Sequence, residues 1–207
     1  MTVFMNTSTA NTQDSLADYY ALLHERITLP EALFDVSWGC DAIPVGDRLR
    51  WSHRLLQHAS SADQQGLSFS RVVDRLVLLK PLELQKVLCA TALLRHQEEL
   101  RRCIDGTVVR KLQTVVGTSV LDRVMRSRLI CRFKPETSDL SVSSLTAEAF
   151  GALNAIFVGS RNPLLDFMRI ALPVHLEQVC SSWSEAEFEE FLLETHVCFP
   201  EIKWLSG

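Results

Sequence analysis

Apolar positions recur at helical spacing along most of the chain, and they predict a succession of α-helices. The pattern is densest from Pro81 to about residue 104, where Val87–Leu94 is apolar on nearly every side. A helix that is apolar all round must be surrounded by other elements. We therefore expect the segment 81–104 to be the central helix of one core, beginning after a break at Lys80.

Cap residues mark the helices that follow. Asp105 begins one predicted helix and Gly117 ends it, and Ser119 with Asp122 has the spacing of a capping box for the next helix. Asn162 followed by Pro163 marks another helix start. Pro173 is expected to end the helix that begins at Pro163, and further helices are expected at 14–27, from 47, from 70 and at 145–158.

The last predicted helix has the fullest local signature. Ser184 and Glu187 have capping-box spacing, and Trp183 is placed to pack on Phe188 as a hydrophobic staple. The spacing assigns one set of residues to an inner face, namely Phe188, Phe191, Leu192 and Thr195. It turns the acidic set outward, namely Glu185, Glu189, Glu190 and Glu194.

These patterns predict an all-α, compact multi-helix domain without repeats and with at most a minor β element at 128–133. Residues 1–13 are polar and read as a disordered tail. We expect 14–207 to form a single helical domain, whose weakest internal boundary lies near 132–143. At the end of the chain, the apolar segment around Trp204 either folds back on the core or offers an exposed aromatic to a partner.

Charge is distributed unevenly. Residues 95–134 carry 10 basic and 4 acidic side chains, whereas residues 135–207 carry 3 basic and 11 acidic ones. Such asymmetry can orient a protein between two partners of different charge. The alternative is that the two regions face each other or only solvate their helices.

Composition bounds the class of protein. Apolar residues make up 47% of the 207 residues, and six cysteines are spread without a CxxC pair. This favours a globular protein with reduced thiols over a disulfide framework. No apolar run approaches the roughly 20 residues of a membrane span, and the N-terminus lacks the features of a secretion signal. We therefore expect a cytoplasmic protein without membrane insertion.

Catalytic, cofactor and metal sites are not expected. Cys89, His96 and Cys103 share a helix face, but successive members are about 10 Å apart along the axis, too far for one metal ion. No nucleotide-binding, hydrolase or metalloprotease motif is present. An enzyme without a recognisable motif remains the weaker alternative. A DNA-binding regulator that uses the basic segment 101–134 is the other alternative, although the isoelectric point near 5.9 disfavours it.

The segment Leu93–Ile104, with the sequence LLRHQEELRRCI, resembles the most recognisable stretch of the SctK (YscK-like) family of bacterial type III secretion systems. The resemblance extends over Pro81–Ile130 and rests on a helix pattern, not on a catalytic signature. It implies a non-catalytic, cytosolic adaptor in the sorting platform of the injectisome, a virulence machine. Such an adaptor links the cytoplasmic domain of the inner-membrane ring protein (SctD class) to the pod protein (SctQ class), and indirectly to the stator and ATPase.

Partner surfaces follow from this hypothesis. We expect no nucleic acid as partner, and we expect the charged outer side chains to make the contacts. The candidate residues are Arg101, Arg102, Arg123, Arg126, Arg128, Glu185, Glu189, Glu190 and Trp204.

Overall fold

The computed structural model describes residues 17–24, 34–39, 47, 50, 69–129, 139–157, 163–177, 179 and 183–199. Within these ranges every regular element is a helix, which confirms the all-α prediction. The described helices are one at 17–24, then η1 (Val36–Trp38), α4 (Val72–Arg75), η3 (Leu76–Leu78), α5 (Pro81–Arg95), α6 (Gln97–Arg102), α7 (Gly106–Val116), α8 (Thr118–Arg126), α9 (Val142–Ile156), α10 (Pro163–Ile170) and α11 (Glu185–Cys198). None of them is long and apolar enough to cross a membrane.

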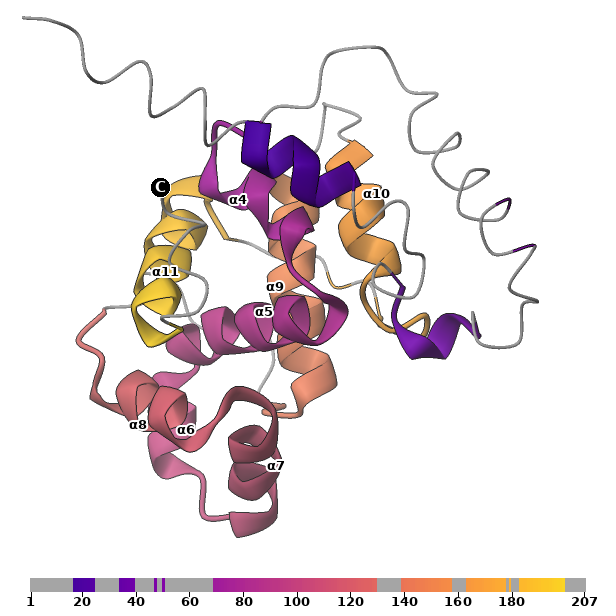
Figure 1. Cartoon of the computed structure of the whole chain (residues 1–207). Helices are drawn as coiled ribbons and strands as arrows, with labels where there is room; N and C mark the ends of the chain where they lie inside the picture. Colours follow the sequence, from indigo (N-terminus) through magenta and orange to yellow (C-terminus); the bar gives the residue numbers. More distant parts are fainter. Residues whose placement is uncertain are drawn as a thin grey trace, which may run out of the picture.

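The apolar helix α5 is the centre of the molecule, as the sequence predicts. It crosses the middle of the view in Figure 1, and α7, α8, α9 and α11 all pack against it. Every side chain from Val87 to Arg95 is buried. The helix begins at Pro81, and the backbone N–H of Lys80 donates to the Glu83 carboxylate at 2.9 Å. Proline and this local bond together fix the start of the helix.

The expectation of one continuous helix over 81–104 is wrong. α5 ends at Arg95, His96 takes φ −92° and ψ 17°, and α6 runs from Gln97 to Arg102. The backbone bonds continue across the break, since the N–H of Leu100 still donates to the carbonyl of His96 at 2.9 Å. The break is therefore a bend, and the side chain of His96 is held there by a residue of α9 described below. Helices α6, α7 and α8 lie below α5 in Figure 1 and are called the α6–α8 lobe.

A single glycine joins α7 to α8. The Asp105 carboxylate accepts from the N–H of Thr107 at 2.8 Å, so the predicted start of α7 is confirmed. Gly117 ends α7, also as predicted, with φ 93° and ψ 150°. It is at the same time the residue before α8, so Ser119 lies inside the first turn and makes no cap. The predicted capping box of Ser119 and Asp122 is therefore wrong.

Replacing Gly117 by alanine is expected to lower the free energy of unfolding by about 1–2 kcal/mol, because a side chain disfavours this positive φ. Gly106, the first residue of α7, is the matched control. A Cβ there meets only the flexible end of Arg110, at 3.9 Å. Gly106→Ala should stabilise by about 0.4–1 kcal/mol through the unfolded state. Urea unfolding of both variants checks this, and equal effects would contradict it.

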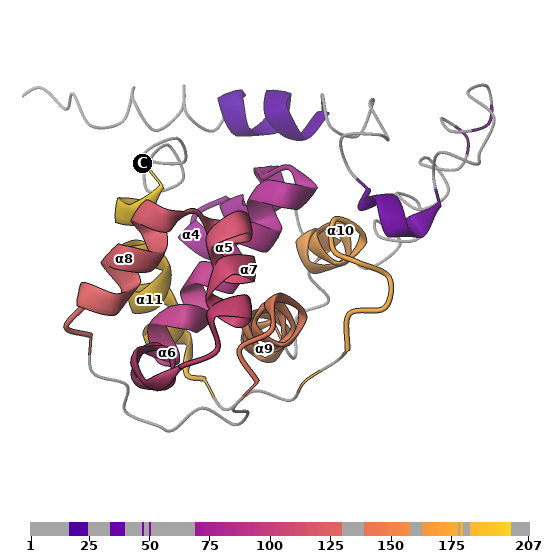
Figure 2. The ribbon, with the colours of Figure 1, turned by 90° about the horizontal axis from the view of Figure 1, so that it is seen from below.

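The second half of the chain contributes α9, α10 and α11. Ser141 caps α9 by accepting from the N–H of Ser144 at 3.2 Å, and the helix begins three residues before the expected Leu145. α10 begins at Pro163 and ends at Ile170, before Pro173, as predicted, while Asn162 lies outside the described residues. Figure 2 shows α9 and α10 on one side of α5 and α8 with α11 on the other.

The signature of α11 is confirmed in large part. The N–H of Glu187 donates to the Ser184 hydroxyl at 3.2 Å, and the Trp183 and Phe188 rings lie 5.5 Å apart. The four residues of the predicted inner face are all buried. The reciprocal half of the capping box is not made, because neither carboxylate oxygen of Glu187 has a partner among the described residues.

The buried apolar side chains form one cluster that extends from Tyr19 to Phe199. The tail over 1–13, the single domain over 14–207 and the boundary near 132–143 stay predictions, since residues 1–16 and 130–138 lie outside the described ranges. Of the possible strand at 128–133, residues 128 and 129 are not in a strand, and the others are not described.

Candidate protein-interaction surfaces

The exposed arginines of the α6–α8 lobe lie along α8. This helix buries Val120, Leu121 and Val124 and turns Arg123 and Arg126 to solvent. Arg128 is exposed just after the helix. We call Arg123, Arg126 and Arg128 the basic surface. The fold leaves these three side chains available to a partner.

Arg101 serves the fold instead. Its guanidinium donates to the backbone carbonyls of Met125 and Ser127 at 2.6 and 3.1 Å, and to the side chain of Gln97. Gln97 in turn donates to the carbonyl of Leu129. Carbonyls at a helix C-terminus lack partners within their own helix, and α6 supplies them here. Arg101 therefore fastens α6 to the end of α8, which the sequence did not predict.

Arg102 is the exposed neighbour of Arg101. Its side chain is 79% exposed and lies 3.4 Å from the Glu98 carboxylate, one turn earlier on α6. An exposed pair of this kind adds little to stability. Arg102 thus remains available for contacts.

The acidic candidates lie along α11. Glu190 is exposed and Glu189 is half-buried, and we call these two residues with the half-buried Glu194 the acidic surface. Glu185 accepts from Arg71 at 3.0 Å and so links α11 to the start of α4. Trp204, the last candidate, lies outside the described residues.

The two charged surfaces adjoin each other. α8 and α11 pack side by side and appear as neighbours in both Figure 1 and Figure 2. Charges from both surfaces act on the thiol of Cys198 on α11. Burial raises its pKa, and the charge of Glu194 raises it further, whereas the charge of Arg123 lowers it. Arg123 of the basic surface and Glu194 of the acidic surface therefore lie close enough to act on the same thiol.

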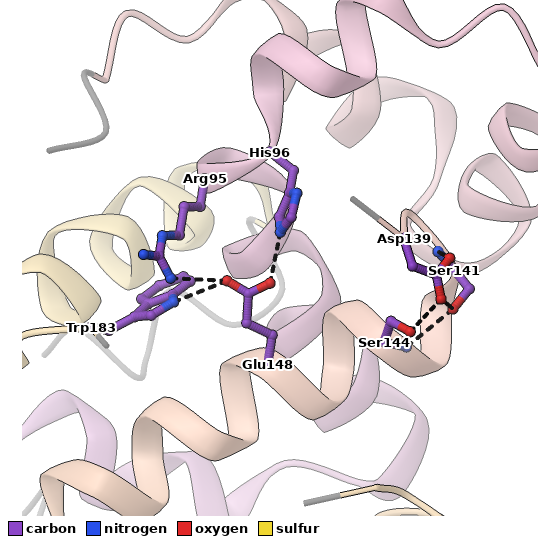
Figure 3. A network of polar contacts seen from close by, with 7 residues as sticks. All are labelled: Arg95, His96, Asp139, Ser141, Ser144, Glu148 and Trp183. Carbon is purple, nitrogen blue, oxygen red and sulfur yellow. Dashed lines mark hydrogen bonds and ion pairs between the residues drawn. The ribbon is translucent and has the colours of Figure 1, made fainter. Parts of the chain in front are cut away.

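A buried charge cluster lies where α5 bends, and the sequence analysis did not identify it. Figure 3 shows Glu148 of α9 between Arg95 and His96, with Trp183 beside it. The carboxylate accepts from Arg95 Nη1 at 3.0 Å and from Trp183 Nε1 at 3.1 Å on one oxygen. His96 Nε2 lies 2.7 Å from the other oxygen. The side chains of Arg95, His96 and Glu148 have no exposed surface.

These partners keep Glu148 ionised. Burial alone raises the pKa of a carboxyl group, but the hydrogen bond and charge of His96, the indole of Trp183 and the charge of Arg95 outweigh it, so the pKa of Glu148 lies below its usual range. The Arg95 guanidinium also lies over the Trp183 ring, 5.0 Å from its centroid. The cluster joins α5, α9 and the residue before α11 at one point, and its charged side chains have no exposed surface, so it holds these elements together.

The stripe of Cys89, His96 and Cys103 does not form a site in this structure. Cys89 is fully buried, and burial raises the pKa of its thiol to about 12, so it stays protonated. His96 is engaged with Glu148, and Cys103 is half-buried at the end of α6. No three potential ligands from His, Cys, Asp and Glu come together among the residues that the structure describes.

A pocket of about 380 Å³ lies between α5, α7 and the start of α9. Its lining includes the side chains of Lys111, Asp139 and His175. Hydrogen bonds from Ser144 and Ser141 lower the pKa of Asp139, which makes this carboxylate a weaker base. Figure 3 shows Asp139, Ser141 and Ser144 together at the start of α9, where Ser141 caps the helix. This arrangement does not resemble a catalytic acid–base pair.

Comparison with known proteins identifies a family. The HrpB4 family, described as a bacterial type III secretion protein, matches residues 27–201. The comparisons with curated proteins and with solved structures give no match. The matched range contains the buried charge cluster and both charged surfaces. It also covers well over half of the 207 residues, and the chain therefore belongs to the HrpB4 family of bacterial type III secretion proteins.

Proposed function

We propose that this protein is a non-catalytic adaptor of the type III secretion sorting platform, equivalent to the SctK family that its segment Leu93–Ile104 resembles. In this role it works at the cytosolic face of the machine. It links the cytoplasmic domain of the inner-membrane ring protein (SctD class) to the pod protein (SctQ class), and through the pod protein to the stator and ATPase. Membership of a type III secretion family supports the setting.

The observation that supports the proposal is the position of the ionisable side chains in the fold. The described ionisable groups with strong partners, such as Arg95, Glu148 and Arg101, are used to hold helices together. The arginines of the basic surface are exposed instead, and the acidic surface has Glu190 exposed with Glu189 and Glu194 half-buried beside it. Opposite charges on one rigid helical body can set the orientation and the rate of encounter with two different partners. A DNA-binding role is less well supported, because the acidic surface adjoins the basic one and would repel phosphates.

Charge reversal separates the two contacts. Arg123→Glu, Arg126→Glu and Arg128→Glu together should weaken binding to one partner at least about tenfold and spare the other, since like charges across an interface cost several kcal/mol. Glu189→Lys with Glu190→Lys should have the converse effect. Paired pull-downs of the full chain with the ring and pod proteins measure both contacts.

The control is Lys86→Glu, a charge reversal at an exposed position of α5 outside both charged surfaces. It should leave both contacts intact. Loss of both contacts in every variant, or of neither, would refute the assignment of the surfaces. Binding to duplex DNA that weakens steeply with salt would favour the regulator instead.

A further inference from the structure

Helix α11 is apolar on two opposite sides. Its inner side, with Phe188, Phe191 and Leu192, is buried against the core. Its outer side still presents Leu193 and Val197, each 49% exposed. A helix at the surface of a globular protein ordinarily has one apolar face, and a helix that is apolar on several sides is ordinarily covered on several sides. The outer side of α11 therefore has the character of a surface that another element covers.

The outer residues have the spacing of a helix-pairing seam. Ala186, Glu190, Leu193 and Val197 follow one another at intervals of four, three and four residues, and all four are exposed. This is the a/d repeat of a coiled coil, which averages 3.5 residues and keeps one stripe facing a partner helix. We call these four residues the outer seam. A polar residue at one seam position, here Glu190, is a recognised device for fixing register.

Acidic side chains frame the outer seam. Glu189 lies on one side of it and Glu194 on the other, and Glu190 lies within it. Flanking charges in coiled coils select partners of opposite sign and reject those of the same sign. A second α11 would bring these carboxylates together, whereas a helix with lysine or arginine beside its apolar stripe would pair with them.

We propose that the outer seam of α11 docks an amphipathic helix of a partner protein, with an apolar a/d stripe flanked by basic residues. The inference deepens the adaptor role and rests on it, because it gives the acidic surface a specific mode of recognition. Leu193 and Val197 supply the apolar contact. Glu189, Glu190 and Glu194 supply the selection by charge.

The test uses the full chain and two labelled peptides of 21–28 residues, both with leucine at a and d. One carries lysine at e and g, and the other carries glutamate there. Fluorescence anisotropy should show binding of the lysine peptide and at least about tenfold weaker binding of the glutamate peptide. Leu193→Ser with Val197→Ser should weaken the first complex at least about tenfold, as expected for central apolar contacts, without changing the melting temperature by more than a few degrees. Glu189→Lys with Glu194→Lys should reverse the preference between peptides.

Other results would overturn the proposal. Equal binding of both peptides, or binding unaffected by the serine substitutions, would show that the outer seam is not the docking site. A dimer that the serine variants dissociate would assign the seam to a second copy of this chain. Binding that appears only in Trp204→Ser would assign it to the chain's own C-terminal segment.

Failure of the seam and failure of the adaptor role are distinguishable. Peptide binding uses no secretion component, so it can succeed while co-purification with the ring and pod proteins fails, which would refute the adaptor. If the serine double variant still co-purifies with both partners, docking of a partner at the outer seam is refuted, whereas the adaptor role is not.

Discussion

Replacing Glu148 by glutamine is expected to lower the free energy of unfolding by about 3–5 kcal/mol, the usual result of breaking a buried ion pair from one side. The change preserves the shape of the side chain but leaves the Arg95 guanidinium buried without the Glu148 charge. Urea unfolding followed by circular dichroism measures the loss. Glu190→Gln, the same chemical change at an exposed position of α11, should stay within about 0.5 kcal/mol of the parent.

A second substitution separates charge from packing. Arg95→Met in the Glu148→Gln background removes the stranded charge, so the double variant should be more stable than Glu148→Gln alone. Further loss in the double variant would mean that Arg95 acts through its stacking on Trp183 and not through its charge.

The contribution of Glu148 to the stability of the fold depends on pH. Because the pKa of Glu148 is lower in the folded protein than in the unfolded chain, its stabilisation is present above the ordinary glutamate pKa, about 4.3, and is lost as the pH falls through the lowered value. Stability of the parent should therefore decline more steeply with acid than that of Glu148→Gln. Parallel acid profiles would contradict an ionised Glu148.

Phe188→Ala is expected to cost about 3–5 kcal/mol, because it opens a cavity where α11 packs on α5. The ring has no exposed surface and contacts Trp183, so its loss also frees the indole that donates to Glu148. The matched control is Leu193→Ala on the opposite side of the same helix, where half the side chain is already in water. That change should cost less than about 1 kcal/mol.

Thermal and urea unfolding of the two variants check this pair. A small loss in Phe188→Ala would show that α11 is held mainly by its polar links to α4 and α9. A large loss in Leu193→Ala would show that the outer seam is covered in the free protein.

Local signals were predictable from the sequence. The caps at Asp105 and Ser184, the proline start of α5 and the packing of Trp183 on Phe188 depend on residues within five positions of each other. The apolar stripes of α5 and α11 were predictable for the same reason, since helical spacing is a local property.

Long-range pairings were not predictable. Arg95 and Glu148 each interrupt an apolar run, which signals a buried polar residue, but 53 positions separate them and only the fold brings them together. No proline or glycine marks the bend at His96, whose side chain is held by the same glutamate. Both the sequence and the structure place Arg101 near the end of a helix. The carbonyls to which it donates, however, belong to the end of α8 and not to its own helix.

The adjacency of α8 and α11 has a consequence for how a complex would grow. Two proteins that docked on neighbouring helices would meet over the line where these helices touch, and each would change the area left for the other. Binding of the first protein would then strengthen or weaken binding of the second, so that the ternary complex would assemble in a preferred order. Measuring one affinity with and without saturating amounts of the other protein would give the sign of that coupling.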